Sequence, residues 1–116
     1  MHVTIYHNPR CSKSRETLAL LQEKDLQPEV VLYLETPPDQ KRLKQILKAL
    51  GLTARDIMRT KEEEYSNLGL ADESLSESAL IDAIVSHPRL LERPIVVVGD
   101  RAAIGRPPEA VLSLFE

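Results

Sequence analysis

The chain is poor in cysteine and in aromatic residues: its 116 residues include one Cys, three Tyr, one Phe and no Trp. A single cysteine excludes an internal disulfide, and an unpaired thiol is typical of a reducing compartment, so we expect a cytoplasmic protein. The N-terminal residues lack a signal-peptide pattern and no apolar run reaches membrane-spanning length, so no membrane partner is expected. Few aromatic side chains and a net charge of -3 argue against nucleic-acid binding, which relies on base stacking and phosphate neutralisation.

The chain also lacks internal repeats, low-complexity tracts and Gly/Ser-rich linkers. Its length suits one ordinary domain that buries about two-thirds of its unfolded surface without disulfides or metals. We therefore expect a single domain over residues 1–116, and we expect it to be a monomer. The three histidines and the cysteine show no metal-ligand spacing, so neither a metal site nor a bound cofactor is predicted.

Hydrophobic periodicity predicts elements in the order β-α-β, then helices, then β-β-α. The turn of the second pair of strands is indicated by Gly99-Asp100, which is a hairpin signature. The expected outer elements are Val3–Tyr6, Ser12–Lys24 and Glu29–Tyr33, then Ile95–Val98, Ala102–Ile104 and a short helix from Pro107 through Leu114.

Helices alone are predicted between these outer parts. Asp39 is placed to cap a helix that ends at Gly51 and whose leucine and isoleucine residues recur with the helical period. A second helical stretch is predicted over about 53–68, and a third begins after a cap at Ser74 or Ser76.

This order of elements is typical of an α/β protein with a small four-stranded mixed sheet flanked by helices. The β-α-β unit requires a parallel crossover, whereas the hairpin is antiparallel. The expected fold is therefore thioredoxin/glutaredoxin-like, with a helical insertion at about 39–91 between the second and third strands.

The one cysteine, Cys11, lies between the first strand and the first helix. Around it stand Arg10, Lys13 and Arg15, together with two histidines, and no carboxylate precedes Glu16. Helix N-termini and neighbouring cations lower the pKa of a thiol, and the thiolate is the form that attacks electrophiles. A lone cysteine is usually a small buried apolar residue. The polar neighbours of Cys11 favour the reactive thiolate over that alternative.

Two arginines that directly precede prolines, Arg93 and Arg106, are candidates for an anion site beside Cys11. If the third strand runs antiparallel to the first, all three residues lie at one edge of the sheet. The proline after each arginine holds its backbone extended, and both a guanidinium fork and a helix N-terminus suit a tetrahedral oxyanion. The alternative for each arginine is simple solvation at the surface.

The chain resembles the glutaredoxin-dependent arsenate reductases over nearly its whole length. The resemblance rests on YHNPRCSKSRETL, LYLETPP, DIMRTKEEEYSNLGLA, ALIDAIVSHPRLLERPIVV and GRPPEAVL, in that order. It implies that Cys11 is the nucleophile, with His7 favouring its thiolate. It further implies an oxyanion site of Arg59, Arg93 and Arg106, and a cis proline at Pro94.

Several of these roles have local alternatives. The His7 imidazole either tunes the sulfur or simply hydrogen-bonds the turn before the helix. Ser14 completes a C-x-x-S pattern, as in monothiol redox proteins, and shapes the site, or it is an ordinary early helix residue. From sequence alone Arg59 reads as a solvated helix residue, so its role comes from the resemblance.

The implied chemistry begins with attack of the Cys11 thiolate on arsenate. Glutathione then reduces the adduct as a co-substrate, arsenite leaves, and glutaredoxin regenerates the thiol as a partner protein. A single cysteine agrees with this scheme, because a chain without a second thiol needs an external one. The sequence departs from characterised members at Arg10, at Ser12-Lys13 and at Gly105, which leaves the physiological substrate open.

Two other functions stay open. One is a glutathione-dependent thiol oxidoreductase with a substrate other than arsenate. The other is a redox regulator similar to the Spx-type factors that bind RNA polymerase, which commonly use C-x-x-C. Because Ser14 occupies the second position and the arginine set is complete, the sequence favours an enzyme over the regulator.

Overall fold

The structure is a computed structural model, and it describes residues 2–116. Within these residues no helix has the length and apolar character that crossing a bilayer requires. The elements in chain order are β1 (Val3–His7), α1 (Ser12–Glu23), β2 (Glu29–Leu32), α2 (Gln40–Leu50), η1 (Arg55–Ile57), α3 (Glu63–Asn67), α4 (Glu77–Ser86), η2 (Pro88–Leu90), β3 (Ile95–Val98), β4 (Arg101–Ile104) and η3 (Pro108–Phe115), where η denotes a 3-10 helix.

The chain forms two compact units, and each is described separately. The sheet unit joins the residues up to Thr36 with Arg93–Glu116, and the helical unit comprises Pro37–Glu92. The helical unit therefore interrupts the sheet unit between β2 and β3. That the whole chain behaves as one domain, and as a monomer, stays a prediction.

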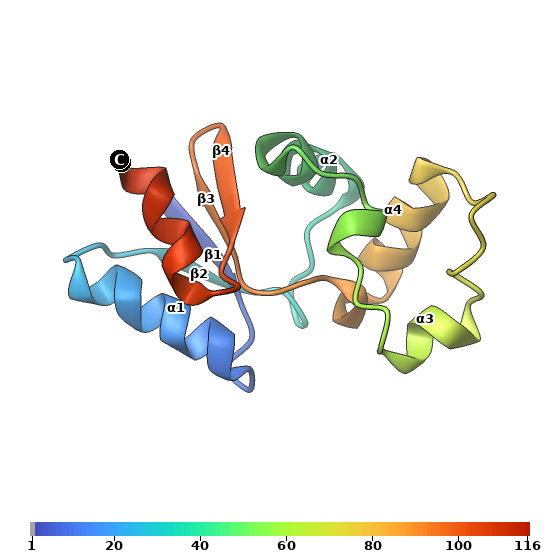
Figure 1. The fold of residues 1–116 in the computed structure, drawn as a ribbon, viewed down its shortest axis with the longest axis horizontal. Helices are drawn as coiled ribbons and strands as arrows, with labels where there is room; N and C mark the ends of the chain where they lie inside the picture. The colour runs from blue at the N-terminus through green and yellow to red at the C-terminus, as the bar shows by residue number, and fades with distance from the viewer. Residues whose placement is uncertain (1) are drawn as a thin grey trace. The chain divides into compact units, whose positions relative to one another are not determined.

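The sheet unit contains four strands in the order β2-β1-β3-β4 (Figure 1). β1 pairs with β2 in parallel, while β3 pairs antiparallel with both β1 and β4. The predicted α/β fold, with a mixed sheet and a helical insertion between the second and third strands, is confirmed. The antiparallel direction of β3 also confirms the condition on which the convergence of Cys11, Arg93 and Arg106 depended.

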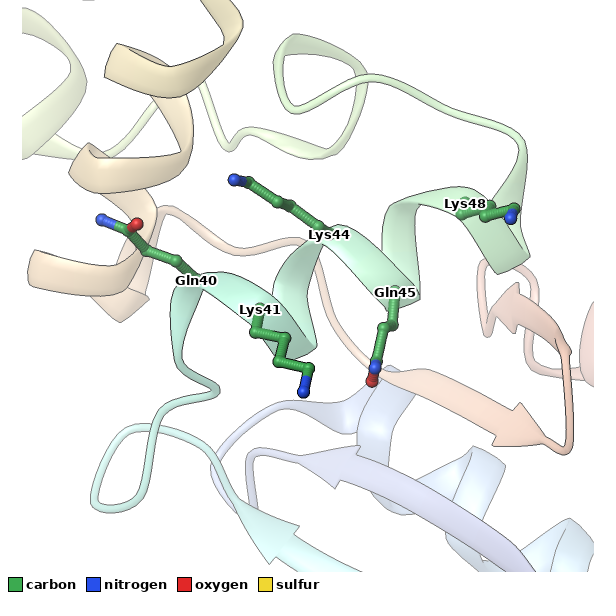
Figure 2. A pocket seen from close by; sticks show the side chains of 5 residues that line it. All are labelled: Gln40, Lys41, Lys44, Gln45 and Lys48. Carbon is green, nitrogen blue, oxygen red and sulfur yellow. The ribbon is translucent and has the colours of Figure 1, made fainter.

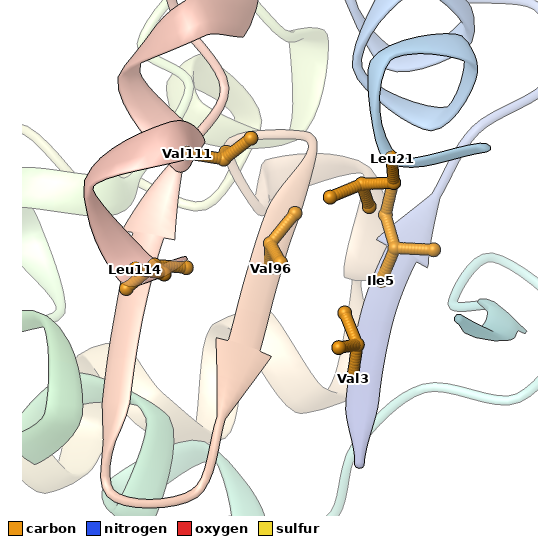
Figure 3. Packing of buried hydrophobic residues seen from close by; sticks show 6 residues of the cluster. All are labelled: Val3, Ile5, Leu21, Val96, Val111 and Leu114. Carbon is orange, nitrogen blue, oxygen red and sulfur yellow. The ribbon is translucent and has the colours of Figure 1, made fainter. Parts of the chain in front are cut away.

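The core of the sheet unit lies between one face of the sheet and the helices α1 and η3. Successive strand residues point to opposite faces, so alternate residues of β1 reach this core. Leu21 of α1 is fully buried against them. Figure 3 shows the six clustered side chains, which are Val3, Ile5, Leu21, Val96, Val111 and Leu114.

The helical unit is organised by helix caps that the sequence indicates. The Asp39 side chain accepts a hydrogen bond of 2.7 Å from the Arg42 backbone N–H at the start of α2. Gly51 ends α2 with a left-handed φ of 71°, a conformation that glycine adopts without steric cost. At the start of α4 the cap is Ser76, whose Oγ accepts from the Ala79 N–H at 3.1 Å. The structure thus decides between the two cap residues that the sequence left open.

The continuous helical stretch predicted over about 53–68 is wrong. The structure has two short helices there, η1 and α3, separated by a non-helical segment that holds a bridge residue and a turn. In that segment Met58 forms a β-bridge with Leu91, and the Arg59 N–H donates to the Leu90 carbonyl at 2.7 Å. Backbone groups that would hydrogen-bond within a helix are therefore paired with residues more than thirty positions away in the sequence.

Candidate active site

Cys11 ends a short loop between β1 and α1, and it is the N-cap residue of α1. Asn8 holds this loop from within. Its carbonyl accepts from the Cys11 N–H, and its side-chain oxygen accepts from the Arg10 N–H, both at 3.0 Å. Asn8 is itself buried, whereas Cys11 is partly exposed. The side chain of Cys11 is therefore partly accessible to solvent. Hydrogen bonds within the loop restrict the conformation of its backbone.

Arg106 and Arg93 meet at this sulfur from the two outer ends of the β3–β4 hairpin. Arg106 donates from Nη2 to Cys11 Sγ at 3.5 Å. Its Nε donates to the Arg93 carbonyl at 2.7 Å, which ties the two arginine segments together. The Arg93 side chain also hydrogen-bonds the sulfur. The predicted convergence of these three residues is therefore present in the structure.

A proline follows each arginine, and both peptide bonds are cis. The cis Arg93-Pro94 bond is the one that the resemblance implies, whereas cis Arg106-Pro107 is an addition. The Pro94 carbonyl accepts from the Gly105 N–H at 2.9 Å, so the residues beside the two arginines are joined as well.

Several groups act on the pKa of Cys11, and they act in opposite directions. Burial is the largest influence and raises it. The backbone N–H groups of Ser14 and Lys13 and the hydrogen bond and charge of Arg93 lower it, and together they prevail. The pKa of Cys11 therefore lies below that of an ordinary cysteine, as expected for a thiol at a helix N-terminus beside a guanidinium.

His7 and Ser14 form a buried pair beneath the loop. His7 Nδ1 lies 2.6 Å from Ser14 Oγ, and the same oxygen accepts from the Asn8 N–H at 3.0 Å. Burial and the charge of Arg15 lower the pKa of His7, which favours its neutral imidazole beside the Ser14 hydroxyl. His7 thus reaches the sulfur through Ser14, whose backbone N–H points at Sγ.

Arg59 lies in the helical unit, in the non-helical segment between η1 and α3, so its reading as a helix residue is wrong. Its Nε donates to Glu62 at 3.3 Å and its Nη1 to Glu92 at 2.9 Å. Only 22% of its side chain is exposed. The sheet unit brings together the other predicted site residues, whereas an oxyanion-binding role for Arg59 stays a prediction.

Sequence reasoning missed Asn8 and Thr17, and it noted Gly105 only as a departure from characterised members. Asn-Pro is a turn signal, and it marks the residue that organises the loop. Gly105 packs so closely that an added Cβ would collide with the Thr17 side chain and lie 2.8 Å from Pro94 Cγ. No local pattern signals this approach, because it joins α1 to the residue before β3 and the residue after β4.

Two hollows are relevant to binding. In the sheet unit a cleft of about 260 Å³ lies beside the Cys11 loop, lined by residues 7–10 and by Leu32, Leu34 and Glu35. In the helical unit a shallow hollow of about 450 Å³ lies along α2 (Figure 2). Its lining has three lysines, two glutamines and no nucleophile, so it offers positive charge but no reacting group.

The fold and the site together define a thioredoxin-like protein with one activated thiol at the N-terminus of its first helix. The model of the ArsC family matches residues 6–114, and the chain belongs to this family. It is 63% identical over 113 residues to the uncharacterised protein YfgD of Escherichia coli K12, covering 97% of this chain and 95% of that one. It is 53% identical over 116 residues to the arsenate reductase of Haemophilus influenzae, covering 99% and 100%. The solved arsenate reductase of Vibrio cholerae superimposes with a TM-score of 0.95 at 54% identity, covering 97% of both chains.

Proposed function

We propose that this protein reduces arsenate to arsenite, using the Cys11 thiolate as nucleophile and glutathione as reductant. The observation that carries the proposal is the contact of 3.5 Å between Arg106 Nη2 and Cys11 Sγ, at a sulfur whose pKa is lowered. Membership of a family that contains arsenate reductases supports the choice of substrate.

In the first step Cys11 Sγ attacks the arsenic atom of arsenate. A sulfur–arsenic bond forms, one arsenic–oxygen bond breaks, and the departing oxygen leaves as water after taking up protons from solvent. Guanidinium groups stabilise this step because they are already positioned where negative charge collects on the oxygens. Arg106 and Arg93 are suited to this role, and by resemblance Arg59 is a third ligand.

In the second step the thiolate of glutathione attacks Cys11 Sγ. The sulfur–arsenic bond breaks, and its electron pair stays on arsenic, which passes from the +5 to the +3 state and leaves as arsenite. Cys11 is now a mixed disulfide with glutathione. A glutaredoxin thiolate attacks the glutathione sulfur, which frees Cys11, and a second glutathione restores glutaredoxin. Because this cycle consumes reduced glutathione, we assign it to a reducing compartment such as the cytoplasm.

The test is turnover of purified protein with arsenate, glutathione and glutaredoxin, followed as glutathione oxidation. Cys11→Ser should abolish turnover. Arg106→Lys keeps the positive charge but loses the planar guanidinium that can donate two hydrogen bonds to an oxyanion. Because a hydrogen bond to a charged group contributes about 1.5–3 kcal/mol, kcat/KM for arsenate should fall about tenfold or more. Arg101→Lys is the matched control, because Arg101 starts β4, which ends two residues before Arg106, and bonds the Ser113 carbonyl instead. Equal rates for Cys11→Ser and the parent protein would refute the proposal.

The same assay distinguishes the two alternatives. A thiol oxidoreductase with another substrate would reduce a glutathione mixed disulfide, and would do so without Arg93 and Arg106. A polymerase-binding regulator would show no thiol turnover at all and would instead retain RNA polymerase subunits. Arg59→Lys, measured beside Arg106→Lys, tests the role that the resemblance implies for Arg59.

A further inference from the structure

The cleft of about 260 Å³ in the sheet unit lies at the carboxyl ends of two parallel strands. β1 and β2 run side by side with His7 opposite Leu32, and the cleft opens where both strands end. Ligands of open α/β sheets bind at such carboxyl ends. The loop that forms one wall of the cleft continues directly into Cys11, so this wall ends one residue before the nucleophile.

Both walls of the cleft are held by hydrogen bonds, so the cleft exists before any ligand arrives. On one side Asn8 fixes the backbone of Arg10 and of Cys11 at 3.0 Å each. On the other side the Leu32 carbonyl accepts from the N–H groups of Glu35 and Thr36, both at 2.9 Å, and closes a tight turn. A preformed site loses less conformational entropy on binding than one that must be ordered.

The lining combines apolar walls with one charge of each sign. Pro9, Leu32 and Leu34 supply apolar surface, and the two leucines are 37% and 41% exposed. Arg10 and Glu35 supply the charges, and within residues 2–116 neither side chain forms an ion pair. A complementary ligand is therefore small, partly apolar, and carries both a carboxylate and an ammonium group.

The lining also accounts for a segment that the oxyanion site leaves unexplained. LYLETPP begins at Leu32, the last residue of β2, and contains neither the nucleophile nor an arginine. Its Tyr33 is fully buried, whereas Leu32, Leu34 and Glu35 face the cleft. Partly exposed leucines beside an unpaired carboxylate suit a ligand that brings its own methylene groups and ammonium.

We propose that this cleft binds glutathione, with a carboxylate on the Arg10 guanidinium and the ammonium on Glu35. The inference rests on the proposed function, which requires a peptide thiol at Cys11. The Cα atoms of adjacent residues are about 3.8 Å apart, so the backbone of the cleft wall at Arg10 adjoins that of the nucleophile. The cleft is slightly smaller than the about 300 Å³ at which typical small-molecule sites begin, which suits a short peptide that stays partly exposed.

The test uses Cys11→Ser protein and S-methylglutathione, which cannot form a disulfide, with amide chemical shifts followed by NMR. Saturable shifts are expected at residues 7–10 and 32–35. Arg10→Glu should weaken binding about tenfold or more, because it replaces a charge-assisted hydrogen bond with repulsion. Arg10→Lys should recover part of the loss. Lys24→Glu makes the same charge change on the sheet unit away from the cleft, and should bind like the parent protein.

Three results would overturn the inference: shifts that do not saturate, saturable shifts centred on other residues, or unchanged affinity in Arg10→Glu. Arg10 is exposed, so this variant is expected to fold, and its circular dichroism spectrum checks that it does. Because no arsenate is present, the result is independent of turnover. Glutathione binding in the cleft without arsenate reduction would contradict only the proposed function. Arsenate reduction with glutathione bound elsewhere would contradict only this inference.

Discussion

At the scale of the residue, the state of Cys11 depends on groups of two kinds. The N–H groups of Ser14 and Lys13 belong to the helix that Cys11 itself begins, and they would be present in any chain with this local structure. The guanidinium groups of Arg93 and Arg106 lie more than eighty residues away in sequence and reach the sulfur only through the sheet.

Alkylation of Cys11 as a function of pH measures the combined effect. Because only the thiolate reacts, the rate should rise through the folded pKa and level off above it, with a midpoint below the about 8.5 of a free cysteine. Arg93→Gln should move the midpoint upward, since it removes a hydrogen bond and a charge that favour the thiolate.

Arg101→Gln provides the matched control for that titration, because the Arg101 guanidinium bonds carbonyls of η3 and not the sulfur. Its midpoint should equal that of the parent protein. A parent midpoint at or above that of free cysteine would contradict the lowered pKa, and with it the proposed nucleophile.

At the scale of the element, local sequence predicted most helix ends because their caps are local. Asp39 and Gly51 delimit α2 through bonds to neighbours within four residues, so the sequence contains all that is needed. The helix predicted from Thr53 to Leu68 is wrong for the opposite reason. There Met58 pairs with Leu91, and this tertiary pairing overrides helix propensity.

Ser76→Ala tests the cap that the structure selects for α4. Loss of the bond from the Ala79 N–H to Ser76 Oγ should lower the free energy of unfolding by about 1 kcal/mol in urea titrations. Ser74→Ala is the control, because Ser74 bonds the exposed Asp72 side chain instead and should cost clearly less. Equal losses in the two variants, or a larger loss in Ser74→Ala, would show that Ser76 is not the cap.

At the scale of the whole molecule, the helical unit is inserted between two strands of one sheet. The chain passes from the sheet unit to the helical unit after Thr36 and returns at Arg93. Since β3 pairs directly with β1, the sheet cannot form until the chain has traversed the entire helical unit. The prediction of one domain over residues 1–116 rests on the length of the chain and on its lack of linker-like stretches.

Leu21→Ala tests that prediction. The substitution empties part of the sheet-unit core and should cost about 2–5 kcal/mol. If the two units unfold together, residue-resolved urea titrations by NMR should show the same lowered midpoint for Val97 in β3 and for Ile81 in α4. A helical unit that keeps its original midpoint while the sheet unit melts earlier would establish two domains instead.

The sequence by itself determined the order of the strands, the caps of α2, and a thiol at a helix start among cations, because each of these follows from neighbours a few residues apart. Only the tertiary structure decided that Arg93 and Arg106 meet Cys11, that Arg59 is held by Glu62 and Glu92, and that Gly105 packs against Thr17. These contacts join segments far apart in the chain, and the pairing of strands that sets their positions is not encoded in any local pattern.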